Sequence, residues 1–242
     1  MNVGEEMLAA GAEIHRVEDS MNRILKALGA VRVDTFIITS SMVVTVHDEG
    51  GEVYTETRRI CGTGTDFERL HLLNALSRRI CAGEVTAEKI DTELEAARSA
   101  KNYPLWLEFV CYAVIAGAFT LFFGGNILQA LFSLGVGAAV RSVLLLCDFT
   151  VKNRIFSKFA GSFVATACAF FASYCGIPGG ADAIIIGNIM TLIPGIGLTN
   201  AMRDIFTGDS ITGILRCIEA LLAALAIAAG YFVLAALTGG GV

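Results

Sequence analysis

The chain has 242 residues, of which 55% are hydrophobic and 17% are charged, and its net charge at neutral pH is −5. Its mean hydropathy of +0.65 is too high for an ordinary soluble domain and is typical of a membrane protein. The negative net charge, without any basic block, argues against a nucleic-acid partner. Seven cysteines and three histidines form no metal-binding pattern, so reduced cysteines, no metal and no cofactor are expected.

Charged residues are concentrated before Lys101. Residues 1–101 hold 12 of the 18 Lys and Arg residues and 17 of the 23 Asp and Glu residues, whereas residues 102–242 consist mainly of long apolar segments. We therefore expect a membrane protein in which a small cytoplasmic α+β domain over 1–101 precedes a transmembrane α-helical bundle over 102–242.

The first domain is expected to combine helices with a small antiparallel sheet. The predicted elements are a helix over 7–28, two or three antiparallel strands within 31–37, 42–46 and 53–60, and helices over 66–81 and 86–100. Gly29 is a stop signal for the first helix, Asp48–Gly51 is a hairpin signal between two strands, and Asp66 is suited to cap the next helix.

Five apolar segments in the second domain approach or exceed the roughly 17–25 residues that span a bilayer. They cover residues 105–123, 127–147, 159–177, 183–202 and about 214–237. With the first domain in the cytoplasm, all six basic residues of this half lie at or near the cytoplasmic side, which is the positive-inside pattern. We expect five spans, with the N-terminus inside and the C-terminus outside. Small residues such as GVGAA at 135–139 predict close helix packing.

Polar side chains inside the predicted spans are costly in hydrocarbon. The candidates are Glu108, Asn126, Gln129, Arg141, Asn188, Thr191, Asn200 and Glu219. Three of these residues lie near span ends, where lipid headgroups or water can solvate them: Glu108, Asn126 and Gln129. Arg141 either extends toward the membrane surface or pairs with Asp148, and the sequence leaves both options open.

The fourth predicted span contains LIPGIGLTNAMRD at residues 192–204. Pro194 removes a helix hydrogen bond, and Gly195 and Gly197 add flexibility, so carbonyl groups near 190–193 are expected to be freed. Irregular backbone at this depth survives only when it is buried in protein or lines a wet cavity, and interrupted helices often form substrate sites in transporters. A proline-kinked packing helix is the alternative interpretation.

Polar residues also cluster in the early stretch GAEIHRVEDSMNRI, on one side of the first predicted helix. The spacing alone is explained by a solvated face supported by an Asp19–Arg23 pair.

This early stretch has the pattern G-x-E-x-x-R-V-E-D, and residues 194–209 read P-G-x-x-L-x-N-x-x-R-D-x-x-x-G-D. Together with the order of the two domains, these two motifs resemble the threonine/serine exporter family over nearly the whole chain. Members of that family are inner-membrane secondary exporters with a cytoplasmic N-terminal domain. The resemblance implies a role at the cytoplasmic mouth for Gly11, Glu13, Arg16 and Glu18, beside the alternative of a solvated face. In the late motif the matching residues are Pro194, Gly195, Asn200, Arg203, Asp204, Gly208 and Asp209.

Full-length members of this family carry ten spans, and this chain resembles the first half. The resemblance therefore implies a separately encoded, small hydrophobic membrane subunit of the second-half type as partner, in a homo- or hetero-oligomer surrounded by lipid. It implies threonine, serine or a small dicarboxylate such as succinate as cargo.

We expect a subunit of a proton-linked exporter in the bacterial inner membrane, and no enzyme. The expected substrate pathway or gate consists of Asn188, Thr191, Pro194, Gly195, Gly197, Asn200, Arg203, Asp204, Asp209 and Arg141. A half-helix N-terminus after Pro194 would attract a substrate carboxylate. The candidates for carrying the coupling proton are Glu108, Asp204 and Glu219. Two other hypotheses are a membrane-anchored hydrolase that acts around Glu13, His15 and Glu18, and a regulatory protein whose first domain binds a cytoplasmic partner.

Overall fold

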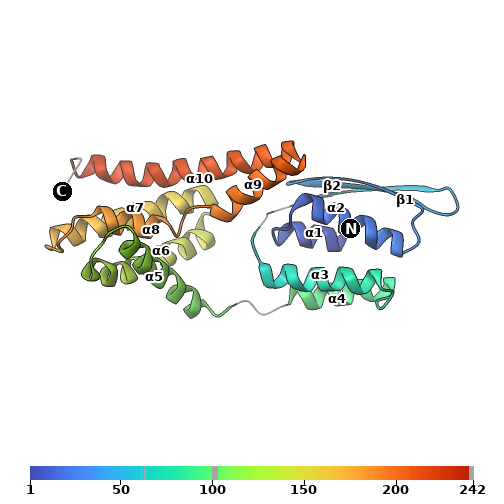
Figure 1. The fold of residues 1–242 in the computed structure, drawn as a ribbon, viewed down its shortest axis with the longest axis horizontal. Helices are drawn as coiled ribbons and strands as arrows, with labels where there is room; N and C mark the ends of the chain where they lie inside the picture. Colours follow the sequence, from blue (N-terminus) through green and yellow to red (C-terminus); the bar gives the residue numbers. More distant parts are fainter. Residues whose placement is uncertain (61, 63, 100–102, 240–242) are drawn as a thin grey trace. The chain divides into compact units, whose positions relative to one another are not determined.

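The computed structural model describes residues 1–60, 62, 64–99 and 103–239 (Figure 1). The chain forms two compact units. The first consists of Met1–Asn102 with Leu198–Cys217, and the second of Tyr103–Gly197 with Ile218–Val242. The division into domains over 1–101 and 102–242 stays a prediction, and Lys101 lies outside the described residues.

The first unit combines helices with one three-stranded sheet. Its elements are α1 (Asn2–Ala9), α2 (Ile14–Ala27), β1 (Arg32–Ile38), β2 (Ser41–His47), β3 (Val53–Arg59), α3 (Phe67–Cys81), the 3-10 turn η1 (Ala87–Lys89) and α4 (Ile90–Arg98). Most of α9 (Gly195–Thr207) and the beginning of α10 (Ser210–Leu237) belong to this unit as well.

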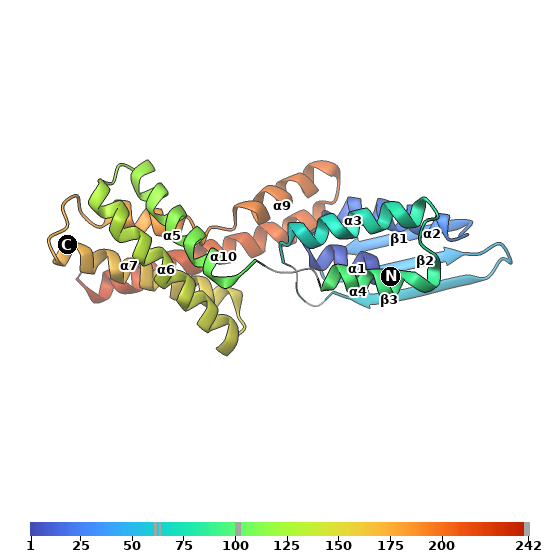
Figure 2. The same ribbon diagram turned by 90° about the horizontal axis from the view of Figure 1, so that it is seen from below.

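The sheet is antiparallel in the order β1-β2-β3, with Phe36 opposite Val43 and Val43 opposite Thr57. Helices α1 and α2 lie against one face of it, and α3 and α4 lie side by side beyond them (Figures 1 and 2). Met21 and Met42 are fully buried in the core between these layers. The predicted strands and the hairpin at Asp48–Gly51 are therefore confirmed.

The prediction of one helix over residues 7–28 is wrong, because the structure has two helices where periodicity indicated one. The chain breaks at Gly11, whose φ of +92° is one that residues with a side chain rarely adopt. A Cβ at this position would also collide with the backbone carbonyl of Gly64. The apolar stripe is buried from Met7 to Ile24 nonetheless, because both helices face the same core.

The predicted signals for helix ends agree with the structure. Gly29 follows the end of α2 with a φ of +102°. The Asp66 carboxylate accepts a hydrogen bond of 2.9 Å from the backbone N–H of Arg69 and so caps α3. Both predictions are confirmed, because each depends only on neighbours within one helical turn.

The second unit is a bundle of helices. It contains α5 (Leu105–Phe122), α6 (Ile127–Thr150), α7 (Arg154–Tyr174), α8 (Asp182–Ile189) and the remainder of α10. Large apolar side chains cover its outside, for example Phe122 at 76%, Ile127 at 74% and Leu225 at 65% exposure. An exterior of this kind is suited to lipid and not to water.

Four helices in the described part of the chain are long and apolar enough to cross a membrane, namely α5, α6, α7 and α10. This supports a multi-pass membrane protein, but not the predicted count of five spans. The fourth predicted span, 183–202, is not one helix, because α8 ends at Ile189 and α9 begins at Gly195. With eight residues, α8 is only about 12 Å long.

Small residues allow the bundle helices to approach closely. A Cβ on Gly137 of α6 would lie 2.5 Å from the carbonyl oxygen of Tyr112, and one on Gly230 of α10 would lie 2.5 Å from that of Phe159. Gly137 belongs to the predicted small-residue run, and its contact confirms that expectation, whereas Gly135 of the same run faces open space.

Candidate functional site

In the first unit, the end of α9 turns sharply into α10. Gly208 has a φ of +102°, and the backbone N–H of Asp209 donates to the carbonyl of Asp204. Gly213 allows the two helices to lie close together, because a Cβ there would approach the carbonyl of Ala201 to 2.8 Å. This hairpin fixes the positions of Arg203 and Asp204 on α9 and of Arg216 on α10.

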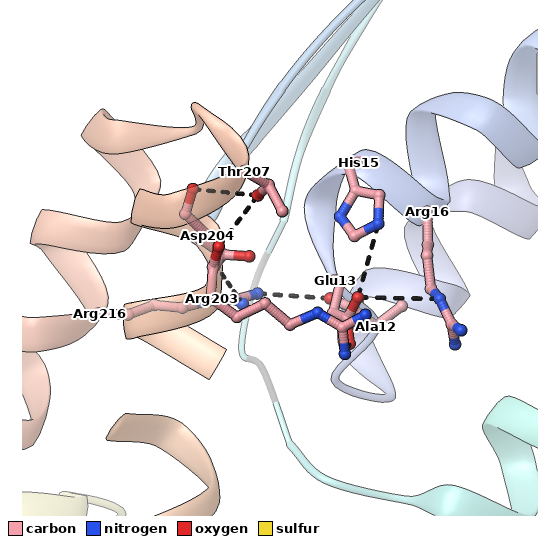
Figure 3. A network of polar contacts seen from close by, with 8 residues as sticks. All are labelled: Ala12, Glu13, His15, Arg16, Arg203, Asp204, Thr207 and Arg216. Carbon is pink, nitrogen blue, oxygen red and sulfur yellow. Dashed lines mark hydrogen bonds and ion pairs between the residues drawn. The ribbon is translucent and has the colours of Figure 1, made fainter. Parts of the chain in front are cut away.

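The hairpin contacts the turn between α1 and α2 (Figure 3). The Arg203 guanidinium donates a hydrogen bond of 2.7 Å to the Glu13 carboxylate, although 190 residues separate the two in sequence. Arg216 donates at 2.6 Å to Asp204 Oδ2 and at 3.3 Å to the carbonyl oxygen of Ala12. Glu13, Arg203, Asp204 and Arg216 are called the charge cluster below.

The charge cluster is partly shielded from water. Asp204 is fully buried, the Arg216 side chain is 14% exposed, and the Glu13 side chain is 13% exposed. Arg203 is 52% exposed and forms the outer edge. Because charges attract each other more strongly away from water, the Asp204–Arg216 pair is the more strongly coupled of the two.

Several polar atoms around the cluster are buried and accept or donate no hydrogen bond within the described residues. They are Asp204 Oδ1, Glu13 Oε2 and His15 Nδ1. The nitrogens of His15 and Arg16 lie 3.7 Å from Glu13 Oε2, close enough for an ion pair but too far for a good hydrogen bond. An unpartnered oxygen on a buried carboxylate is costly, and a proton on it would reduce that cost.

Two carboxyl groups here have raised pKa values. Burial raises the pKa of Asp204, Arg216 opposes this effect, and the nearby carboxylates of Asp209 and Glu13 add to it. Burial also raises the pKa of Glu18, with a contribution from Asp209, although its carboxylate accepts a 3.2 Å hydrogen bond from the backbone N–H of Ile37. Both groups therefore hold a proton to higher pH than an exposed carboxyl group does.

The structure thus brings the early and the late motif together. Glu13 of the early motif meets Arg203 of the late one, and Gly11 makes the turn that places Glu13 there. Arg216 was missed as a functional residue by sequence reasoning. A signal for it exists, because Arg216 is a lone cation in an apolar segment.

A second group of predicted residues surrounds the break between α8 and α9. The expected interruption at Pro194 is present, and the Lys158 ammonium of α7 donates to the carbonyl oxygen of Leu192 within it. Thr191 donates a 2.7 Å bond to the carbonyl of Asn188. The Asn188 amide is fully buried and donates to the Ile184 carbonyl, while its Oδ1 accepts no hydrogen bond within the described residues.

Arg141 of α6 pairs with Glu108 of α5, not with Asp148, and its guanidinium lies 5.5 Å from the ring centre of Tyr112. Glu219 is exposed on α10.

Asn126 and Gln129 hydrogen-bond each other's backbone N–H groups at 2.8 and 2.9 Å at the start of α6. This reciprocal cap confirms their interpretation as residues of a helix end. Within the described part of the chain, no three His, Cys, Asp or Glu side chains are grouped so that they could hold a metal.

A family model described as "Putative threonine/serine exporter" matches residues 1–238. The chain is 25% identical over 240 residues to the threonine/serine exporter of Corynebacterium glutamicum, covering 94% of this chain and 48% of that protein. It is 23% identical over 250 residues to the pheromone-regulated membrane protein 10 of Kluyveromyces lactis, covering 96% of this chain and 25% of that protein.

Another relative is similar in length to this chain. The protein named "Probable succinate transporter subunit YjjP" of Klebsiella aerogenes is 25% identical over 234 residues, which cover 93% of this chain and 86% of that protein. The chain therefore spans a half or less of some curated relatives and most of others. No solved structure matches the chain.

Proposed function

Because the chain belongs to the threonine/serine exporter family, we propose that it is a subunit of a secondary exporter of small metabolites in the bacterial inner membrane. The observation that carries this proposal is the contact between the two motifs: Glu13 and Arg203 join the α1–α2 turn to the hairpin that follows the interrupted helix. A contact of this kind links a cytoplasmic domain to an element that has to change shape during transport.

The proposed cargo is an amino acid such as threonine or serine, or a small dicarboxylate such as succinate. The names of two relatives, a threonine/serine exporter and a probable succinate transporter subunit, support both classes. Each cargo carries a carboxylate, and two features around the break suit one: the positive charge of the Lys158 ammonium, and the positive end of the dipole of α9, which begins at Gly195. Asn188, Thr191, Pro194, Gly197 and Asn200 are proposed to form the pathway around them.

We assign the coupling proton to Asp204. Its carboxylate is fully buried, one of its oxygens lacks a hydrogen-bond partner among the described residues, and burial raises its pKa. Both Glu108 and Asp204 pair with an arginine, but the Glu108 side chain is 35% exposed and Glu219 is exposed as well, so both are less suited than the buried Asp204. Asp209 and Glu13 contribute to the field around Asp204, and Arg16 and Glu18 of the early motif are proposed to lie at the same cytoplasmic mouth.

The proposed topology has the N-terminus in the cytoplasm. The part of α10 in the second unit, Ile218–Leu237, has 20 residues and extends about 30 Å, enough for one crossing. We propose that α8 and the break through Gly197 make an interrupted fourth crossing, which places the C-terminus outside. The word "subunit" in the name of a relative of similar length supports a second membrane protein as partner.

The test is efflux of labelled threonine, serine and succinate from a deletion strain and from the same strain complemented with the chain, alone and together with a second-half membrane protein. Complementation is expected to speed the loss of one of these solutes from loaded cells. Equal retention of all three in every strain would overturn the proposal. Substrate turnover by the purified chain without any efflux would instead favour the hydrolase hypothesis.

A further inference from the structure

We propose that Arg216 is a positioning residue which transmits the protonation state of Asp204 to the turn between α1 and α2. The inference rests on the proposed function in that Asp204 carries the coupling proton. It goes further by naming the path from that proton to the α1–α2 turn. The guanidinium of Arg216 holds both ends of this path, Asp204 Oδ2 at 2.6 Å and the carbonyl of Ala12 at 3.3 Å.

The two acceptors of Arg216 differ in kind. Asp204 supplies a charge, and Ala12 supplies only a carbonyl dipole in a turn that Gly11 keeps in a left-handed conformation. The charged acceptor therefore sets the position of the guanidinium, since hydrogen bonds between ionised groups are about twice as strong as neutral ones. Ala12 is itself buried, so its carbonyl has poor access to water when Arg216 withdraws.

A proton taken from water onto Asp204 Oδ1 leaves the carboxyl group neutral and Arg216 without its counter-charge. The other groups that act on Asp204 are Glu13 in the α1–α2 turn, His15 on α2 and Asp209 in the turn after α9, while Arg203 on α9 pairs with Glu13. Glu13 already binds Arg203, and its other oxygen has no hydrogen-bond partner among the described residues. Arg216 is therefore drawn toward Glu13 or toward water, and the Ala12 carbonyl loses its donor.

The consequence is a turn that is tight when Asp204 is ionised and looser when Asp204 is protonated. Loosening would weaken the placement of Glu13 and hence its contact with Arg203. In this way one proton changes both contacts between the hairpin and the α1–α2 turn.

Hydrogen exchange of the full chain in detergent micelles tests the proposal, with rates corrected for the intrinsic effect of pH. In the wild type, backbone amides of residues 10–17 are expected to exchange faster, by about tenfold, on the acid side of the Asp204 titration. In Arg216→Gln and in Asp204→Asn the exchange of the same amides is expected to be fast at every pH. Arg216→Lys retains the charge and is expected to keep a smaller step.

Two controls separate this outcome from other causes. Amides of α3 report on global unfolding and are expected to keep their exchange rates in every variant. The His15 imidazole lies 3.7 Å from Glu13 Oε2, so His15→Gln tests whether this neighbour contributes, and this variant is expected to keep the step. A step that persists in Arg216→Gln, a step that disappears in His15→Gln, or no step in the wild type would each overturn the proposal.

The exchange experiment does not depend on transport. If the step requires both Asp204 and Arg216 but the cells export nothing, the positioning role stands and the exporter function fails. If the cells export a solute but the step is insensitive to Arg216, the exporter function stands and the positioning role fails.

Discussion

The carboxylate of Glu13 and the guanidinium of Arg203 are 2.7 Å apart, and they join the α1–α2 turn to the α9–α10 hairpin across 190 residues of sequence. Because Arg203 is half exposed, the pair is expected to contribute only about 0.2–1 kcal/mol to folding. Its role in export is therefore expected to exceed its role in stability.

A charge-reversal cycle tests this expectation. Glu13→Arg and Arg203→Glu are each expected to reduce export while shifting the unfolding temperature little, and the double variant is expected to recover part of the export. Export measured in cells, beside the unfolding temperature of the purified chain, gives the comparison. No recovery in the double variant would show that the two residues act independently.

Gly11 is expected to tolerate no side chain. Gly11→Ala forces a residue with a Cβ into a φ of +92° and against the carbonyl of Gly64, so the first unit is expected to lose at least about 1–3 kcal/mol of stability. Gly29→Ala is the matched control, because Gly29 has a φ of +102° but open space around its Cβ position. Thermal unfolding of both variants is expected to show the larger decrease for Gly11→Ala. Equal decreases would mean that backbone conformation alone explains the effect.

Helix ends and turns of the first unit were predictable from the sequence, whereas the break between α1 and α2 was not. Asp66, Gly29 and the turn at Asp48–Gly51 were predictable because capping and turn formation depend on neighbouring residues only. The break at Gly11 was not, because the apolar stripe continues through it and periodicity cannot distinguish one helix from two that share a core. The close approach of Gly64, which excludes a side chain there, is a tertiary contact.

The candidate site was predictable as two separate motifs but not as one cluster. Spacing along the chain placed Glu13 on a polar face and Arg203 at the end of a span, and nothing local connects positions 190 residues apart. The partner of Arg141 was equally unpredictable, because it is Glu108 on another helix and not Asp148 on the same helix. At the break, proline chemistry predicted freed carbonyls, but it could not identify Lys158 as the donor to one of them.

Lys158 is expected to stabilise the break between α8 and α9. Lys158→Met leaves the carbonyl of the buried Leu192 without its charged donor, which is expected to cost about 1–3 kcal/mol and to reduce export. Arg154→Met, at the exposed start of the same helix, removes an equal charge and serves as the control. The two variants are compared by unfolding temperature and by efflux. Indistinguishable results for both variants would show that the contact between Lys158 and Leu192 does not stabilise the break.

The stability of the first unit is expected to decrease as the pH rises above the ordinary carboxyl range. The folded-state pKa values of Asp204 and Glu18 are raised, mainly by burial, so the folded chain holds protons that the unfolded chain releases. The stability that these protons provide is fully present below the unfolded pKa of about 4 and is lost as the pH passes through the raised values.

Glu18→Gln removes one of these two titrations and is expected to reduce the slope of unfolding temperature against pH in that window. Glu49→Gln, in the exposed β2–β3 hairpin, is expected to leave the slope as in the wild type. A wild-type unfolding temperature that rises with pH, most steeply in this window, would contradict the raised pKa values.

The central claim is that the buried carboxyl group of Asp204 carries the proton that drives export. Its most direct test is the initial rate of efflux of the identified solute from loaded cells, measured at several external pH values with wild type, Asp204→Asn and Asp182→Asn at equal abundance in the membrane. We predict a pH-dependent rate for the wild type and for the exposed control Asp182→Asn, and a rate at the background of the deletion strain for Asp204→Asn. A pH-dependent, wild-type rate in Asp204→Asn would contradict the claim.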